Sequence, residues 1–211
     1  ERRKAIDAVK AGVDQAEELG CKGVAVLSGK ATGDTEGAML LLIDSLKQLA
    51  GYAKSKGMPL VLETFDQVPF GKNCLIGPNA DAVVVSKEVR KEYPDFGIML
   101  DLSHLPLQFE ASAEAIATAG AHLVHAHIGN CAMDDPTHPA YGDNHPRFGA
   151  PGGRNDIAEL TEYLRALLAS GYLSTTVRRV LSFEVKPMQG EDAEAVIAGS
   201  KRTLDAAWRR V

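Results

Sequence analysis

The strict alternation of short apolar segments with longer amphipathic ones limits the fold of this chain more than any other feature. Short runs rich in Val, Ile and Leu predict five strands, at 23–29, 59–65, 97–101, 122–128 and 180–185. Apolar residues at helical spacing predict a first helix that ends at Gly20 and further helices at 36–56, 81–93, 111–119, 155–170 and 191–209. Strands and helices in this order predict a parallel sheet with right-handed crossovers.

Two α/β architectures fit such an order, an open doubly wound sheet and a (β/α)8 barrel. The sequence has no GxGxxG at the first strand-to-helix turn and no P-loop, so the nucleotide-binding open sheets lose support. At 211 residues, the whole range 1–211 fits one domain better than two. Five strands leave an open sheet edge unless other residues or another chain close it, so we expect a homo-oligomer or association with another chain.

Composition and charge exclude several classes of partner. The net charge is -5 and no Lys/Arg-rich run tracks a phosphate backbone, so we expect no nucleic acid partner. No apolar run approaches the ~20 residues of a membrane span, so we expect no membrane partner. Three widely spaced cysteines give neither a disulfide framework nor a CxxC zinc motif, which makes a reducing cytoplasm the simplest compartment.

Polar side chains end four successive predicted strands. Glu63, Asp101, His127 and Glu184 each lie at or near the last position of an apolar run. Because the carboxyl ends of parallel strands meet on one face, these side chains should converge there. Three carboxylates so close together repel one another unless they are protonated or bridged by a cation. We therefore expect one divalent metal ion, bound by these four residues.

The mixed oxygen and nitrogen ligand set suits Mn²⁺, Mg²⁺, Co²⁺ or Zn²⁺, because no thiolate imposes zinc. The alternative is that each of the four residues separately caps a helix or pairs with Lys or Arg. That alternative is plausible for any one residue, but four at equivalent strand ends favour the metal site.

Two further histidines lie near the predicted metal site. His104 comes one helical turn after Asp101. It can be a second metal ligand, a substrate contact, or a loop histidine that hydrogen-bonds the backbone. His125 shares the side of its strand with His127, so it should lie one layer deeper, as a packing residue or a replacement ligand.

Two loops are rich in Pro and Gly, at 65–79 and 129–153. Loops as long as the second are usually functional or disordered. It carries Asp143-x-His145-x-Arg147, which can supply a base, a second-metal ligand pair or an anion clamp, or can be simply solvated. Lys186, two residues past Glu184, is a candidate contact for substrate oxygen or phosphate, although a surface lysine is the commoner outcome. His122 and His138 are expected to have no role.

The ordered set LETFD, MLDLSH, HAHIGN and SFEV resembles the xylose-isomerase-like TIM-barrel superfamily of sugar isomerases, epimerases and endonuclease IV-type enzymes. The resemblance implies a (β/α)8 TIM barrel of which about five β/α units are present, with the first three units absent. It implies a single-metal site at Glu63, Asp101, His127 and Glu184, with Mn²⁺ the preferred ion. In such isomerases the two glutamates, Glu63 and Glu184, also exchange a proton with substrate carbons through a metal-bound enediolate.

The resemblance leaves several functions open. A sugar or keto-sugar isomerase or epimerase comes first, with His104, Arg147 and Lys186 as substrate contacts. The C-glycoside deglycosidase catalytic subunit, a lyase-type relative, would use His145 as a base.

Two more functions stay open. An endonuclease IV-like zinc phosphodiesterase would place a second metal on His104, Asp143 and His145. That branch, however, has a histidine after the strand that here ends in VLSGK, and this sequence has Ser28 in that neighbourhood instead. A non-catalytic barrel subunit would keep the ligands without a complete pocket.

Overall fold

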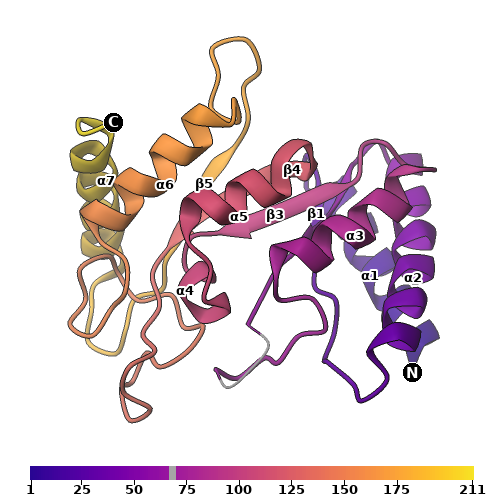
Figure 1. Cartoon of the computed structure of the whole chain (residues 1–211), viewed down its shortest axis with the longest axis horizontal. Helices are drawn as coiled ribbons and strands as arrows, with labels where there is room; N and C mark the ends of the chain where they lie inside the picture. Colours follow the sequence, from indigo (N-terminus) through magenta and orange to yellow (C-terminus); the bar gives the residue numbers. More distant parts are fainter. Residues whose placement is uncertain (67–69) are drawn as a thin grey trace.

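A computed structural model describes residues 1–66 and 70–211, and its centre is one parallel five-stranded sheet with the order β1-β2-β3-β4-β5 (Figure 1). The strands are β1 (Val24–Val26), β2 (Leu60–Glu63), β3 (Gly97–Asp101), β4 (Leu123–Gly129) and β5 (Leu181–Glu184). The helices are α1 (Arg2–Glu18), α2 (Thr35–Ser55), α3 (Asn79–Arg90), α4 (Leu105–Gln108), α5 (Ser112–Ala119), α6 (Ile157–Ala169) and α7 (Ala193–Trp208), with a 3-10 turn, η1 (Gly120–His122).

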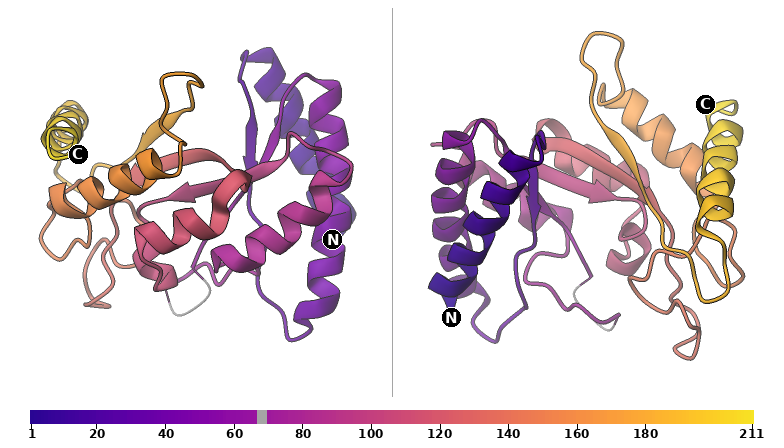
Figure 2. Two further views of the ribbon diagram at one scale, coloured as in Figure 1. Left: turned by 45° about the horizontal axis from the view of Figure 1, so that its top comes forward. Right: turned by 180° about the vertical axis from the view of Figure 1, so that it is seen from behind.

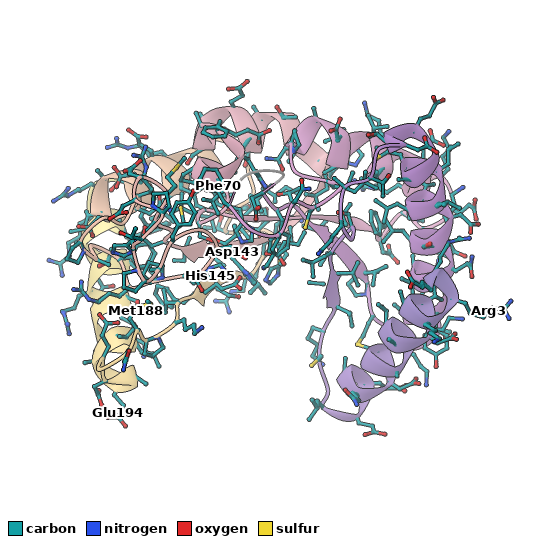
Figure 3. The ribbon with its side chains drawn as sticks, turned by 90° about the horizontal axis from the view of Figure 1, so that it is seen from below. Arg3, Phe70, Asp143, His145, Met188 and Glu194 are labelled. Atoms are coloured by element: carbon teal, nitrogen blue, oxygen red, sulfur yellow. The ribbon has the colours of Figure 1, made fainter. Side chains whose placement is uncertain are left out.

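The sheet is curved into a half-barrel, with the longer helices along its outer side (Figure 3). Helices α1 and α2 lie at one end of the molecule and α7 at the other (Figure 2). Since all neighbouring strands pair in parallel, the prediction of about five β/α units of a TIM barrel is confirmed. Within the described residues, β1 and β5 each pair on one side only.

The alternation of side chains along each strand separates a core face, covered by the helices, from an inner face that is polar at the strand ends. Leu62, Ile98 and Leu100 are fully buried and belong to the main hydrophobic cluster, which includes side chains from the helices. Their strand neighbours point the other way, because successive side chains of a strand face opposite sides. Asp101 is paired in register with His127, whereas Glu184 pairs with Gly129, two residues beyond His127, so the polar strand ends are staggered but lie on the same inner side.

A hollow of about 650 Å³ lies along the inner side of the sheet, towards the amino ends of the strands. It is lined by strand residues including Val61, Met99 and His125, and by Arg178 and Arg179 from the segment before β5. The hollow lies where a closed barrel has its interior, and His127 forms part of its wall below the strand ends.

The predicted elements are all found, with shifted ends. The strand expected at 23–29 is only Val24–Val26, and the helix expected at 81–93 begins earlier and covers Asn79–Arg90. Helix α4 was not predicted, because it is a single turn with a proline in its first turn. The loop expected at 129–153 contains no helix or strand beyond the end of β4. Of the loop expected at 65–79, residues 67–69 lie outside the described residues.

Among the described residues, no helix is both long enough and apolar enough to cross a membrane.

Gly97 opens β3 where the backbone passes close to its neighbour. A Cβ atom at this position would lie 2.3 Å from Val124 Cγ2 and 2.9 Å from the His122 carbonyl oxygen. We predict that Gly97→Ala lowers the free energy of unfolding by about 1–3 kcal/mol, because overpacking displaces β4. Urea unfolding followed by circular dichroism measures the change.

Gly12→Ala in α1 is the matched control. No atom lies within 4 Å of a Cβ at Gly12, and alanine favours a helix interior, so this variant should be neutral or stabilising. Equal stability of the Gly97→Ala and Gly12→Ala proteins would contradict the close approach of β3 and β4.

Candidate metal and substrate site

Four side chains from four neighbouring strands converge at the carboxyl end of the sheet. Glu63, Asp101, His127 and Glu184 each offer a ligand atom, and these atoms all lie within 4.8 Å of one another. Glu63 and Asp101 are buried, whereas His127 and Glu184 are half-buried. The geometry therefore brings together the four residues that the strand ends predicted.

The contacts within this cluster leave two carboxylate oxygens without a hydrogen-bond partner among the described residues. His127 Nδ1 lies 2.5 Å from Glu184 Oε2 and 3.8 Å from Asp101 Oδ2. Glu63 Oε1 and Asp101 Oδ2 are buried and have no hydrogen-bond partner among the described residues. Buried acceptors without a partner are destabilising, and a divalent ion would satisfy both oxygens. The three carboxylates and one imidazole thus fit a divalent metal ion.

The alternative of separate ion pairs with Lys or Arg is not seen among the described residues. In the described part of the chain, the ion pairs of Glu63, Asp101 and Glu184 join histidines and no Lys or Arg. The charge of the cluster is therefore balanced by protons or by an ion.

Burial and charge set the protonation of this cluster. Burial raises the pKa of Glu63 to about 7, and it raises the pKa of Asp101 as well. Burial would also raise the pKa of Glu184, but its hydrogen bond with His127 and the charge of His145 bring that pKa down to about 2. Burial lowers the pKa of His127, but the bond to Glu184 and the nearby carboxylates raise it overall. Without a cation, the cluster therefore retains protons near neutral pH.

Asp143 connects the long loop to this cluster. Its Oδ1 atom lies 3.0 Å from His104 Nε2 and 2.5 Å from His145 Nε2, and its Oδ2 atom contacts Lys72 Nζ. The hydrogen bonds with the two histidines outweigh burial and hold the pKa of Asp143 well below its usual range. Figure 3 shows Asp143 and His145 beside each other. Asp143 is therefore an anion with three partners.

His104 is fully enclosed, with both ring nitrogens in contact with protein atoms. Nδ1 lies 2.9 Å from the Thr64 carbonyl oxygen and Nε2 bonds Asp143, while the ring lies 4.2 Å from that of Phe65. Burial lowers the pKa of His104, but the bond to Asp143 and nearby carboxylates raise it to about 9. His104, three residues after Asp101, is therefore a buried link between β2, β3 and the long loop.

A second group of possible ligands is formed by Asp101, His104 and His145. The sequence expectation placed Asp143 with the two histidines. In the structure Asp143 Oδ1 contacts the Nε2 atoms of both, and its Oδ2 atom contacts Lys72. His145 has a left-handed backbone, with φ of 48°, and its Nδ1 atom lies 3.2 Å from Ser103 Oγ.

The remaining candidates lie outside the cluster. The guanidinium of Arg147 pairs with Glu191 at 2.9 Å, and the side chain of Lys186 is exposed, although its backbone N–H donates to the His145 carbonyl oxygen. His125 lies one layer deeper, as expected, with its ring 4.9 Å from that of His127. His122 lies 2.9 Å from Ser86 Oγ of α3, and His138 accepts a hydrogen bond from the Ala140 N–H, so both bond residues outside the cluster.

Sequence reasoning missed Ser103 and Lys72. The backbone N–H of Ser103 donates to Asp101 Oδ1 at 2.7 Å and its hydroxyl contacts His145, so it links a strand end to the loop. Its place between Asp101 and His104 was the available signal. Lys72 had no such signal, because its position over the Phe65 ring and against Asp143 depends on how the loop folds.

Comparison with known proteins agrees with the half-barrel fold. Residues 1–206 match the family described as xylose isomerase-like TIM barrel. The chain belongs to this family.

Among curated proteins, D-psicose 3-epimerase of Ruminiclostridium cellulolyticum is 29% identical over 105 residues, which make up 50% of this chain and 34% of that protein. The match thus spans about a third of the relative's length.

Solved structures of sugar epimerases superpose on almost the whole chain. A D-psicose 3-epimerase from Clostridium cellulolyticum, crystallised with D-tagatose, has a TM-score of 0.69 at 20% identity, over 99% of this chain and 71% of that one. A 3-keto-D-glucoside 4-epimerase from E. coli has a TM-score of 0.67 at 18% identity, over 97% and 70%. Because the sequence identities are only 20% and 18%, these structural similarities establish the fold alone.

The raised pKa values predict how metal binding depends on pH. Glu63 and His104 keep their protons to higher pH in the folded protein than in the unfolded chain. Between about pH 5 and pH 9 the unfolded state releases these protons first, so the free energy of unfolding they contribute falls as pH rises. A cation takes the place of the Glu63 proton, so Mn²⁺ should raise Tm more at about pH 8 than at about pH 5.5. Thermal unfolding with Mn²⁺ or with EDTA measures the difference.

Glu63→Gln is the control, because it removes the carboxyl group that binds the proton. This variant should gain less from Mn²⁺ at both pH values. The pKa of His122 is lowered, mainly by burial, so this residue makes the free energy of unfolding rise with pH. This contribution is the same in the presence and absence of Mn²⁺, so it does not affect the comparison. An increase in Tm that is larger at the lower pH would contradict this assignment.

Proposed function

We propose that the protein is a divalent-metal-dependent isomerase or epimerase of a sugar or keto-sugar. The observation that carries this proposal is the cluster of Glu63, Asp101, His127 and Glu184, with two buried oxygens that lack hydrogen-bond partners in the described part of the chain. The names of the similar proteins, a D-psicose 3-epimerase and a 3-keto-D-glucoside 4-epimerase, support the substrate class.

The four residues of the cluster would hold one metal ion, with Mn²⁺ the first choice and Mg²⁺, Co²⁺ or Zn²⁺ as alternatives. The bound ion would draw electrons from a carbonyl and a neighbouring hydroxyl of the sugar. This would acidify the C–H bond of the carbon that bears the hydroxyl, next to the carbonyl. A second ion at the Asp101, His104 and His145 group is an extension of the proposal.

The two glutamates would move the proton. They belong to β2 and β5, with Asp101 and His127 between them in the strand order, so they can approach a substrate from two sides. Glu63, with its pKa near 7, can give or take a proton near neutral pH. Glu184 stays ionised and so serves as the base that accepts the proton from carbon.

The remaining polar groups would bind and orient the sugar. His145, whose Nε2 atom lies 3.5 Å from Glu184 Oε1, is proposed as a further acid or base beside the reacting atoms. Lys186 has an exposed side chain just beyond Glu184 and would bind a sugar oxygen. Arg147 would also bind a sugar oxygen, after breaking its ion pair with Glu191. His104 is enclosed by protein atoms and would orient Asp143 and Glu63.

The proposal extends to the surroundings of the enzyme. Additional strands or another chain would cover the unpaired edges of β1 and β5 and complete the substrate pocket. Cys21 is exposed and free, and Cys74 and Cys131 are buried and free, which supports a reducing compartment such as the cytoplasm.

Glu184→Gln tests the acid–base assignment. We expect this variant to keep the fold but lose at least about 100-fold in kcat, the amount that general base catalysis contributes. Ketose epimerisation with Mn²⁺, followed by chromatography of the sugars, measures the rate, and circular dichroism checks the fold. Glu162→Gln, the same change at an exposed residue of α6, should leave the rate unaltered.

An active Glu184→Gln enzyme would remove Glu184 from the mechanism. The same wild-type preparation should be offered a C-glycoside and abasic DNA. Turnover of either one without epimerisation would favour the lyase or the phosphodiesterase over an isomerase.

A further inference from the structure

Two buried asparagines fasten the long loop to the ends of the sheet. Asn130 follows β4 directly and is fully buried, and Asn155, at the far end of the loop, is 2% exposed. The side-chain amide of Asn155 donates to the carbonyl oxygens of Leu102 and Gly129, both at 3.0 Å. These two carbonyls stand where β3 and β4 end, so the end of the loop is tied to the strands that carry Asp101 and His127.

Both the oxygen and the nitrogen of the Asn130 side-chain amide form hydrogen bonds. Its Oδ1 atom accepts hydrogen bonds from the backbone N–H groups of Asn155 at 2.7 Å and Cys131 at 2.9 Å. Its Nδ2 atom donates to the Arg147 carbonyl oxygen at 2.9 Å. Gly153 leaves space for this group, because a Cβ there would lie 2.4 Å from Nδ2. One side chain thus joins the two stems of the loop to its middle.

The bond to Arg147 falls close to the functional part of the loop. Asp143 and His145 lie four and two residues before Arg147, and the Gly142 N–H on their other side donates to the Ala132 carbonyl oxygen at 2.7 Å. Between these two fixed points, His145 adopts its left-handed backbone. On the side that follows His145, the segment is held by the Asn130 bond to Arg147 and by the Lys186 N–H, which donates to the His145 carbonyl oxygen.

We propose that Asn130 is a positioning residue that holds Asp143 and His145 against His104 and the metal cluster, with Asn155 as its anchor on the strands. The side-chain hydrogen bonds of Asn130 go to Arg147, Cys131 and Asn155 rather than to the four proposed metal ligands. Its removal should therefore displace the histidine side of the site while the strand-end ligands stay in place. The effect on catalysis rests on the proposed function, whereas the effect on geometry does not.

The test uses the full chain, metal-free and with ¹⁵N-labelled histidine. Ring N–H protons of His104 and His145 that are held by Asp143 should give low-field NMR signals, and Asp143→Asn should remove them as a reference. Asn130→Asp keeps the Oδ1 acceptor but replaces the donor with an oxygen facing the Arg147 carbonyl oxygen. We expect Asn130→Asp to lose the His145 signal, as Asp143→Asn does.

Asn144→Asp is the matched control. Asn144 also donates to a backbone carbonyl, that of Tyr141 at 2.8 Å, but this bond stays inside the loop. Asn144→Asp introduces the same negative charge at the residue next to His145. A purely electrostatic effect on the His145 signal would therefore be larger in Asn144→Asp than in Asn130→Asp. We expect the His145 signal to persist in Asn144→Asp.

Unchanged histidine signals in Asn130→Asp, or no such signals in the wild type, would overturn the proposal. If Asn130→Asp does not fold, Gly153→Ala repeats the test, because its methyl group displaces the Asn130 amide without a charge; persistence of the His145 signal there would also overturn it.

Mn²⁺ affinity and activity complete the experiment. Affinity of the strand-end site, measured by calorimetry, should be the same in Asn130→Asp and wild type, whereas loss of a residue that orients the ligands themselves would cost about 10- to 100-fold. A loss of that size would overturn the proposed separation of the two sides. Activity on a ketose should fall at least about tenfold in kcat/KM with that affinity retained. An inactive wild-type protein would count against the proposed function, and the NMR comparison would still decide the role of Asn130.

Discussion

The repulsion between carboxylates at the ends of neighbouring parallel strands is the constraint on which the site depends. Parallel pairing brings Glu63, Asp101 and Glu184 to one end of the sheet, where two of them are buried. Such a group is stable only when protons or a cation balance its charge. The site suits both forms of balance, since the pKa values of Glu63 and Asp101 are raised and each has a buried oxygen without a hydrogen-bond partner among the described residues.

The histidines extend this balance outward from the strands. His127 and His145 lie against Glu184, and His104 lies between Glu63 and Asp143. Asp143 in turn contacts Lys72, so charges of alternating sign run from the sheet to the loops. The loop that carries Asp143 and His145 is irregular in its backbone, but buried asparagine amides tie it to the strand ends. Rigid support of this kind suits a loop that would orient a substrate.

The strands and the four strand-end residues could be predicted because both follow from local patterns. Apolar runs bounded by Gly and Pro predicted the strands, and the period of two along a strand placed His125 and His127 on one side. The contacts of the long loop could not be predicted in this way. Whether Arg147 reaches the cluster or Glu191, and whether Asp143 bonds a metal or Lys72, depends on tertiary folding of a segment without periodicity. Helix α4 was not predictable because one turn carries too little pattern.

A crystal structure of the protein soaked with Mn²⁺, with data collected for the anomalous scattering of manganese, tests the central claim most directly. We predict one strong anomalous peak within bonding distance of Glu63, Asp101, His127 and Glu184. No peak at this position, or a peak bound by His104 and His145 without Glu63 and Glu184, would contradict the assignment of the strand-end cluster as the metal site.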